Sequence, residues 1–353
     1  MSRFFSEKFG ALTPYTPGEQ PRERTYIKLN TNESPYPPSP IALRMARQAA
    51  GNLNLYSDPT CQSICKTAAE RYGIDADEVI FTNGSDDILN FAFMAFCDEK
   101  HPAAFADITY GFYPVFAAFN RVPYELIPLQ DDFTIRVEDY IGLGKTIFIA
   151  NPNAPTGIAL PLCDIERIVK GNPDNIVVID EAYVDFGAES AVSLIHKYDN
   201  LLVTQTFSKS RNLAGARLGM GFGCKALIRD LNTLRYSTNP YNINSVTMAA
   251  GIGALTDEAY FSYCCRQISK TRAWTQKELT RLGFETLPSA TNFLFARHPK
   301  IPGRELYLAL KEKGILVRHF DDARITDFNR ITIGSKEEME TLIQTLEAML
   351  CEK

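Results

Sequence analysis

Residues that can carry chemistry stand at the ends of several short apolar runs. Asp180 directly follows "NIVVI", and Tyr183 comes three residues later. Lys209 follows "LLVTQTF", with hydroxyl groups at Thr206 and Ser208 beside it. Alone, an aspartate at a strand end often caps a helix and a lysine is usually a surface charge. In an open α/β sheet, however, strand ends line one ligand-binding crevice, so these groups are expected to converge.

A fourth run supplies a candidate anion site. In "VIFTNGSDD" a strand is followed by a turn at Gly84 and by a helix that begins near Ser85 and Asp86. The first amides of a helix attract negative charge, although Ser85 could equally be an ordinary helix cap. The hydroxyls next to Lys209 and the cation Arg217 could complete a phosphate cup. An amine, an anion cup and a buried carboxylate together suit pyridoxal 5'-phosphate held as a Schiff base.

The elements that would position these residues alternate between strand and helix as far as about residue 235. Continuous apolar runs at 78–82, 145–150, 175–180 and 200–207 are typical of strands buried on both faces, and their alternation with helices predicts a mostly parallel sheet. Beyond that point we expect one long helical stretch over 245–281, then strands at "TNFLFAR", "GILVRHF" and "RITIG" and two further helices.

The fold class expected from this pattern is α/β, with two domains. An N-terminal arm over 1–28 is rich in proline, glycine and charge. A large domain over 29–240 holds the parallel sheet flanked by helices and the cofactor site, and a smaller α+β domain fills 241–353.

Composition excludes several classes of function. The net charge of −5 comes with no long basic run, which disfavours nucleic acid and anionic membranes as partners. No apolar stretch is long enough for a membrane span or a signal peptide. The eight cysteines and four histidines show no metal-ligand spacing, so we expect no metal site and reduced thiols in the cytoplasm.

The order of motifs along the whole chain resembles the fold-type I, class I/II aminotransferases, and among them the histidinol-phosphate aminotransferase group. The motifs that carry the resemblance are "LNTNESPYPP", "NLYSDP", "TNGSDD", "TYGFY", "NPNAPTG", "DEAYVDF", "TFSKSRNLAGARLG", "TNFLFA" and "RITIG".

The resemblance implies a role for each residue around the cofactor ring. Lys209 would bind the cofactor covalently and move the proton during catalysis. Asp180 would keep the pyridine nitrogen protonated, so that the ring accepts electrons. Tyr183 would donate to the ring oxygen and Tyr110 would stack on the ring face.

The resemblance also implies how the phosphate is held and that the protein is a homodimer. Tyr56 of "NLYSDP" is similar to a residue that reaches the phosphate from the neighbouring subunit. Within the chain itself, the expected phosphate ligands are Gly84, Ser85, Asp86 (through its backbone), Thr206, Ser208 and Arg217.

One position departs from the family pattern. The family usually has asparagine immediately before Pro-Thr-Gly, where it donates to the ring oxygen, and here that position is Ala154. Either Asn153 takes over the contact with the cofactor, or it only shapes the turn and Tyr183 serves the ring oxygen without it.

Substrate recognition is expected to need two anion sites. Arg330 of "RITIG" resembles the arginine that binds an α-carboxylate in a bidentate pair, a geometry that suits guanidinium. Arg318 of "GILVRHF" resembles an arginine that meets a substrate phosphate, and Tyr15 of the arm is similar to a residue that closes over that group. Asn32 of "LNTNESPYPP" is assigned to the same substrate site.

The expected reaction is transfer of an amino group between L-histidinol phosphate and 2-oxoglutarate, giving imidazole acetol phosphate and L-glutamate in histidine biosynthesis. An aromatic amino acid aminotransferase and a threonine-phosphate decarboxylase are the alternatives that share the scaffold. A cofactor-binding sensor without turnover would need an additional basic DNA-binding segment, which the sequence lacks.

Overall fold

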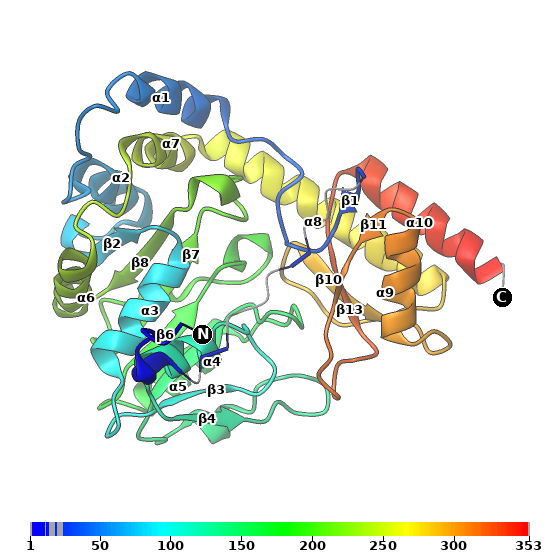
Figure 1. Ribbon diagram of the computed structural model, residues 1–353, viewed down its shortest axis with the longest axis horizontal. Helices are drawn as coiled ribbons and strands as arrows, with labels where there is room; N and C mark the ends of the chain where they lie inside the picture. The colour runs from blue at the N-terminus through cyan, green and yellow to red at the C-terminus, as the bar shows by residue number, and fades with distance from the viewer. Residues whose placement is uncertain (1, 11, 14–17, 20–23, 352–353) are drawn as a thin grey trace.

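A seven-stranded sheet forms the centre of the structure, which is a computed structural model that describes residues 2–10, 12–13, 18–19 and 24–351 (Figure 1). The strand order is β2-β8-β7-β6-β5-β3-β4; β8 is antiparallel to both neighbours and the other pairs are parallel. The expected α/β class and mostly parallel sheet are therefore confirmed. The strands are β2 (Val79–Thr82), β3 (Ala103–Ala106), β4 (Tyr124–Ile127), β5 (Thr146–Ala150), β6 (Val177–Asp180), β7 (Leu201–Thr206) and β8 (Gly219–Gly223).

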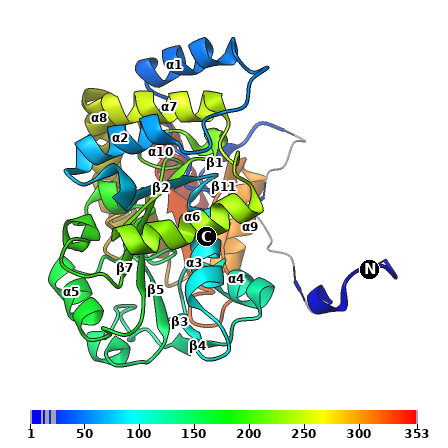
Figure 2. The same cartoon turned by 90° about the vertical axis from the view of Figure 1, so that its left-hand side faces the viewer.

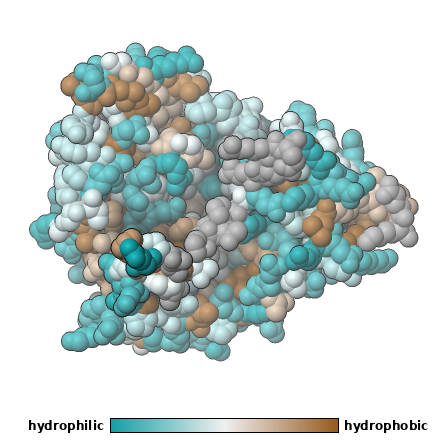
Figure 3. Space-filling model, in the orientation of Figure 1, coloured by the Kyte–Doolittle hydropathy of each residue, from teal (hydrophilic) through white to brown (hydrophobic). Residues whose placement is uncertain are grey.

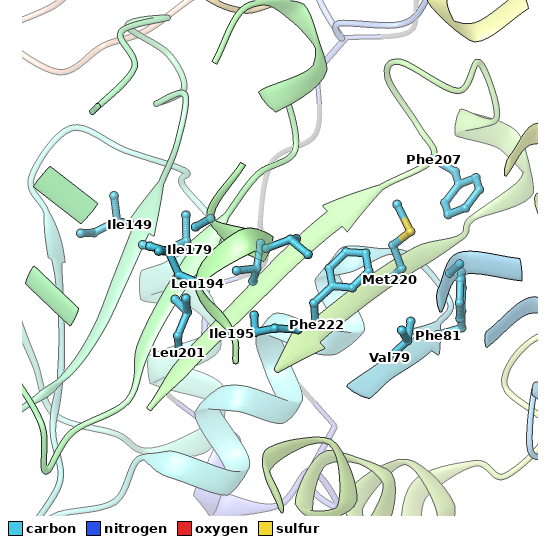
Figure 4. Packing of buried hydrophobic residues seen from close by; sticks show 14 of the residues in the cluster. Val79, Phe81, Ile149, Ile179, Leu194, Ile195, Leu201, Phe207, Met220 and Phe222 are labelled. Atoms are coloured by element: carbon cyan, nitrogen blue, oxygen red, sulfur yellow. The ribbon is translucent and has the colours of Figure 1, made fainter. Parts of the chain in front are cut away.

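Every residue of β2, β3 and β5 to β8 is buried, whereas the edge strand β4 is mostly exposed. Successive side chains of a strand point to opposite sides, so each inner strand contributes to the packing on both faces. Val177 and Ile179 of β6 join one hydrophobic cluster, whereas Val178 between them joins another. Figure 4 shows the first cluster, in which side chains from β2, β5, β6, β7 and β8 pack together. This two-sided burial explains why the strands have continuous apolar sequences.

Helices cover the two faces and supply the remainder of each cluster. On the first side lie residues of α1 (Pro40–Ala50), α2 (Gln62–Tyr72), α5 (Leu162–Lys170) and α7 (Ser245–Thr256). The second cluster takes residues from α3 (Ser85–Phe96), α4 (Tyr113–Asn120) and α6 (Lys225–Thr238). Figure 2 shows α1 lying along α7 at the outside of the molecule.

The C-terminal part has its own antiparallel sheet and its own core. The strand order is β12-β13-β10-β9, and two-residue strands β1 and β11 pair beside it in parallel. These strands are β1 (Ile27–Lys28), β9 (Glu285–Thr286), β10 (Phe293–Arg297), β11 (Ile315–Leu316), β12 (Arg318–His319) and β13 (Asn329–Thr332). The helices packed against them are α8 (Glu258–Arg281), α9 (Gly303–Glu312) and α10 (Lys336–Cys351).

Short 3-10 helices occur in the connections. They are η1 (Glu7–Phe9), η2 (Ala76–Glu78), η3 (Val137–Tyr140), η4 (Val184–Phe186), η5 (Ala191–Leu194) and η6 (Ala214–Ala216).

The helical stretch expected over 245–281 is found, but Asp257 divides it into α7 and α8. Asp257 has a ψ of 65°, outside the helical range, and its side chain accepts a hydrogen bond from the Tyr260 backbone N–H. This N-cap starts α8 in a new direction, and only the backbone geometry reveals it.

The strand β8 was missed by the sequence analysis because its sequence, "GMGFG", is rich in glycine, which is depleted in strands. The glycines are required by close packing. A Cβ at Gly219 would lie 2.3 Å from the Ser85 amide nitrogen, so the strand can approach the start of α3 only with glycine there.

The domain boundaries at 28/29 and 240/241 stay a prediction. The end of the arm, β1, pairs with β11 of the C-terminal part, and α7 packs on α1 and on the cluster of the large sheet. From α8 onward, the helices and strands contribute to the C-terminal core.

Within the described residues, no helix has the length and apolarity needed to cross a membrane. No group of three or more His, Cys, Asp or Glu side chains in that part of the chain could hold a metal ion. All eight cysteines are free.

The second cluster of the large sheet can be tested at Phe148. Its ring is fully buried and stacks on Phe93 with 4.1 Å between ring centroids. Replacing Phe148 with Ala should lower the free energy of unfolding by about 3–5 kcal/mol, since a large cavity remains. Leu308→Ala, at a position about half exposed on α9, should change it by less than about 0.5 kcal/mol. Denaturant unfolding measures both, and equal effects would contradict this account of the core.

Candidate functional site

Two adjoining cavities lie at the carboxyl ends of the central parallel strands. The first, about 380 Å³, includes Asp180, Ser208 and Arg217 in its wall. The second, about 390 Å³, includes Arg318 and Arg330. Five residues line both cavities and mark their junction: Thr31, Tyr110, Ala154, Tyr183 and Lys209. We refer to these spaces as the cofactor cavity and the substrate cavity, after the ligands that the sequence leads us to expect in them.

Lys209 follows β7 and stands at this junction. Its Nζ donates a hydrogen bond to the backbone carbonyl of Thr31 at 3.1 Å and lies 5.8 Å from the centre of the Tyr183 ring. The amine is therefore oriented by the segment between β1 and α1, and it can reach a ligand in either cavity.

Asp180 is buried at the end of β6. Its carboxylate accepts hydrogen bonds from the hydroxyls of Tyr113 at 3.2 Å and Thr204 at 3.3 Å. Burial, followed by the negative charge of Asp86, raises the pKa of Asp180 to about 6 although these hydrogen bonds oppose the shift. A cationic nitrogen beside the carboxylate would favour its charged form, which fits the protonated pyridine of the expected cofactor.

The start of α3 and the loop after β7 form a polar cradle. Gly84 has a φ of +91°, and a Cβ there would lie 2.7 Å from Arg217 Nη2, so glycine leaves room for the guanidinium. Arg217 Nη1 donates to Ser208 Oγ at 3.3 Å, and the Ser208 backbone N–H donates to Thr206 Oγ1 at 3.1 Å. With the free amides at the start of α3, beginning at Ser85, this cradle fits a phosphate group.

Asp86 connects the cradle to the aromatic wall of the cavity. It forms an ion pair with Arg217 at 3.4 Å, and the Tyr110 hydroxyl donates to it at 2.9 Å. Tyr110 thereby lies in the wall of both cavities, where it can cover the face of a planar ring.

The structure does not bring Asn153 into either cavity. Its side-chain amide donates to the Ile108 carbonyl and to Thr156 Oγ1, both at 3.0 Å, and its oxygen accepts from Thr109 at 2.8 Å. All of these bonds hold the loop after β5. Ala154, the position at which the family pattern has asparagine, faces the cavities without a polar side chain.

Arg318 and Arg330 are directly opposite each other on β12 and β13. Their guanidinium carbons lie 5.6 Å and 5.7 Å from the centre of the Phe320 ring, and Arg330 Nη2 donates to the Asn30 carbonyl at 3.1 Å. Two like charges on one wall favour an anionic ligand in the substrate cavity. Asn32 also lines this cavity, whereas Tyr15 lies outside the described residues.

Tyr56 lines neither cavity of its own chain. Its side chain is 85% exposed and stacks on Tyr241 with ring centroids 4.6 Å apart. Its predicted contact with the phosphate would thus require a second subunit.

Several residues at the site were missed by the sequence analysis. Thr31 and Tyr113 stand inside the recognised motifs "LNTNESPYPP" and "ITYGFY", so their position was a usable signal. Thr204 and Phe320 stand in the quoted runs "LLVTQTF" and "GILVRHF", but nothing in their residue types marks them, because only the tertiary packing turns them toward Asp180 and the arginines.

Comparison with known proteins gives a consistent result. The family model for class I and II aminotransferases matches residues 24–346. Histidinol-phosphate aminotransferase of Marinomonas sp. (strain MWYL1) is 51% identical over 353 residues, covering 99% of this chain and 100% of the relative. That of Brachyspira hyodysenteriae (strain ATCC 49526 / WA1) is 48% identical over 352 residues, covering 99% of each.

Solved structures share the fold at lower identity. Histidinol-phosphate aminotransferase from Sinorhizobium meliloti, in complex with pyridoxal-5'-phosphate, has a TM-score of 0.91 at 23% identity over 100% of this chain and 99% of that one. L-threonine-O-3-phosphate decarboxylase from Porphyromonas gingivalis has a TM-score of 0.79 at 21% identity over 93% and 100%.

The raised pKa of Asp180 predicts how the stability of the cofactor-free protein depends on pH. The pKa is about 6 in the folded protein against an ordinary value of 3.8, so between these values the folded state retains a proton that the unfolded chain releases. Stability should therefore fall as pH rises through this window and stay lower above it. Asp180→Asn has no carboxyl group at this position and should not show this loss of stability. The difference in melting temperature between Asp180→Asn and the unsubstituted protein should therefore increase in favour of the variant from pH 4 to pH 7.

The control is Glu189→Gln at an exposed position, whose melting curve should parallel that of the unsubstituted protein. Glu181, also buried with a pKa raised to about 7, is present in every variant and cancels from the comparison. Parallel pH curves for Asp180→Asn and the unsubstituted protein would contradict the assignment of a strained buried charge.

Proposed function

The chain belongs to the class I and II aminotransferase family, whose members are pyridoxal-phosphate-dependent transferases, and we propose that its substrates are L-histidinol phosphate and 2-oxoglutarate. The products would be imidazole acetol phosphate and L-glutamate, as in histidine biosynthesis. The observation that carries the proposal is a lysine amine at the junction of a cavity lined by Asp180, Ser208 and Arg217 and a second cavity walled by two arginines. The full-length relatives at 48–51% identity, which bear this enzyme name, support the same substrate.

When bound through Lys209, pyridoxal phosphate supplies an electron sink for the pair left on the amine-bearing carbon after its proton departs. Lys209 would hold the cofactor, and we assign its amine to carry this proton as base and then as acid. The Thr31 carbonyl, 3.1 Å from Nζ, keeps the amine at the junction between the two cavities.

The other side chains around the cofactor have holding roles in this proposal. Asp180 would pair with the pyridine nitrogen, whose positive charge would lower the pKa that burial raises. Tyr183 would donate to the ring oxygen, and Tyr110 would cover one face of the ring. The phosphate is held by Arg217 and by further groups of the cradle, namely Gly84, Ser85, Asp86 through its backbone, Thr206 and Ser208.

The arginine pair supports a shared anion site for two unlike substrates. Histidinol phosphate carries a phosphate and no carboxylate, whereas glutamate carries two carboxylates. Arg318 and Arg330 are neighbours across one strand pair, so a phosphate and a carboxylate can occupy overlapping positions between them. Asn32 and Tyr15 are proposed to complete this site.

We also propose that the enzyme works as a homodimer in the cytoplasm. Large apolar side chains are exposed near α1, among them Leu53, Leu55 and Tyr56, and Figure 3 shows hydrophobic surface over this part of the molecule. A second copy that covers this surface could bring its Tyr56 to the phosphate cradle. Free cysteines are consistent with a reducing compartment.

Lys209 is tested by titrating the purified protein with L-histidinol phosphate in the absence of a keto acid. The absorption band of the lysine-bound cofactor should convert to that of the amine form of the cofactor. Lys209→Ala should lower turnover by at least about 10³-fold, because among the described residues Lys209 is the only lysine that lines either cavity. Lys197→Ala, at an exposed position paired with Glu166, should keep normal turnover.

The products decide between the proposed reaction and the alternatives. When L-histidinol phosphate and 2-oxoglutarate are both supplied, equal amounts of glutamate and imidazole acetol phosphate support the proposal. Bleaching of the band by phenylalanine or tyrosine but not by histidinol phosphate would indicate an aromatic amino acid aminotransferase. Release of CO2 from L-threonine O-3-phosphate, which carries the carboxylate that histidinol phosphate lacks, would indicate a decarboxylase.

Tyr56 tests the contribution of the second subunit. Tyr56→Phe should weaken cofactor binding by about tenfold, since one hydrogen bond to a charged group is lost. Tyr236→Phe is the control, because that hydroxyl donates to the Pro59 carbonyl on the same surface. Light scattering gives the mass in solution, and unchanged cofactor affinity in Tyr56→Phe or a monomeric mass would refute the proposed arrangement.

A further inference from the structure

Asn32 joins the C-terminal sheet to the phenol of Tyr183. Its Nδ2 donates to Tyr183 Oη at 2.8 Å, and its Oδ1 accepts from Thr332 Oγ1 at 2.9 Å. The Asn32 backbone N–H donates back to the same Thr332 hydroxyl at 3.0 Å. Asn32 and Thr332 are each 1% exposed, so these polar groups depend on one another for their hydrogen bonds.

The direction of each bond in this chain follows from the number of protons available. The Asn32 backbone N–H can only donate, so Thr332 Oγ1 accepts there and its single proton remains for Asn32 Oδ1. If the amide were turned over, the Thr332 proton would have no acceptor among the described residues, and a buried donor without a partner is costly. The amide must therefore point its N–H toward Tyr183.

The backbone fixes Asn32 in this position. Its φ is +55°, in the left-handed region that asparagine tolerates better than most residues. The Asn292 side chain donates to the Asn32 carbonyl at 3.0 Å, which anchors the residue to the loop before β10.

The consequence falls on the hydroxyl of Tyr183. Because Asn32 occupies a lone pair of the phenol oxygen, the phenol proton is free to be donated into the cavities that Tyr183 lines. Ala154, where the family pattern has an asparagine donor, offers no second donor there. The direction of the Tyr183 hydrogen bond therefore has to be set from elsewhere.

We propose that Thr332 and Asn32 form a directional hydrogen-bond relay, from β13 to Tyr183, that makes the phenol a donor to the cofactor ring oxygen. Both are positioning residues, and the inference rests on the proposed function because it requires the cofactor. It also gives Asn32 a role distinct from the substrate contact predicted from the sequence.

The relay can be tested by following the absorption of the lysine-bound cofactor as a function of pH. A hydrogen-bond donor stabilises the negative charge on the cofactor ring oxygen. This matters most when the nitrogen that links Lys209 to the cofactor has lost its proton, because its N–H then no longer balances that charge. The donor therefore favours the deprotonated form of the link. Loss of the donor should raise the midpoint of the spectral transition. Thr332→Val removes the hydroxyl without changing charge or shape and should raise the midpoint by roughly half to one pH unit.

The other variants isolate the cause. Thr332→Ser keeps the hydroxyl and should retain the original midpoint. Asn32→Asp replaces the N–H donor by an acceptor, so Tyr183 would donate to residue 32 and the midpoint should rise further. Asn329→Asp is the matched control: Asn329 is a buried asparagine on β13 that donates to the Gly303 carbonyl outside both cavities, and its midpoint should not move.

Equal midpoints for Thr332→Val and Thr332→Ser would overturn the relay, even if Asn32→Asp does not fold. So would a shift in Asn329→Asp as large as that in Thr332→Val, because it would show a general effect of strand disturbance. If the unsubstituted protein forms no lysine-bound cofactor band, the proposed function fails and the relay with it. A normal band and turnover with unmoved midpoints overturns the relay alone.

Discussion

The buried carboxylate of Asp180 is the constraint around which the site is organised. A negative charge at the inner end of β6 is costly in a folded protein, and the hydroxyls of Tyr113 and Thr204 offset only part of that cost. The carboxylate is fully compensated only when a cation lies against it. The fold thus holds a buried carboxylate, Asp180, and a guanidinium, Arg217, in the wall of one cavity.

The opposite charges of Asp180 and Arg217 in the wall of the cofactor cavity restrict which ligand fits it. A molecule with a cationic ring nitrogen and an anionic phosphate has the matching polarity. Gly84 and Gly219 make this geometry possible, because side chains at either position would meet the guanidinium or the start of α3. The arrangement depends as much on the absence of Cβ atoms as on the charged groups.

The segment from Asn30 to Asn32 holds the two halves of the site together. Asn30 accepts from Arg330, Thr31 accepts from Lys209, and Asn32 bonds to both Tyr183 and Thr332. Three successive residues therefore connect the large sheet with the small one at the point where the cavities meet. A movement of one sheet relative to the other would therefore displace Lys209 and Tyr183 through these hydrogen bonds.

The sequence by itself determined the class of fold, most strand positions and the group of residues at the strand ends. Strands buried on both faces are visible as continuous apolar runs, and their alternation with helical patterns indicates a parallel sheet. It could not reveal β8, whose glycines disguise a strand, nor the break at Asp257, which is a matter of backbone angle. The sequence left the role of Asn153 open, and the structure directs its amide into the loop. Only tertiary structure brought Thr204 to Asp180, aligned Arg318 with Arg330 and set the direction of the bond from Asn32 to Tyr183. Each of these contacts joins residues from separate strands or loops, and their geometry depends on packing that residue order alone does not specify.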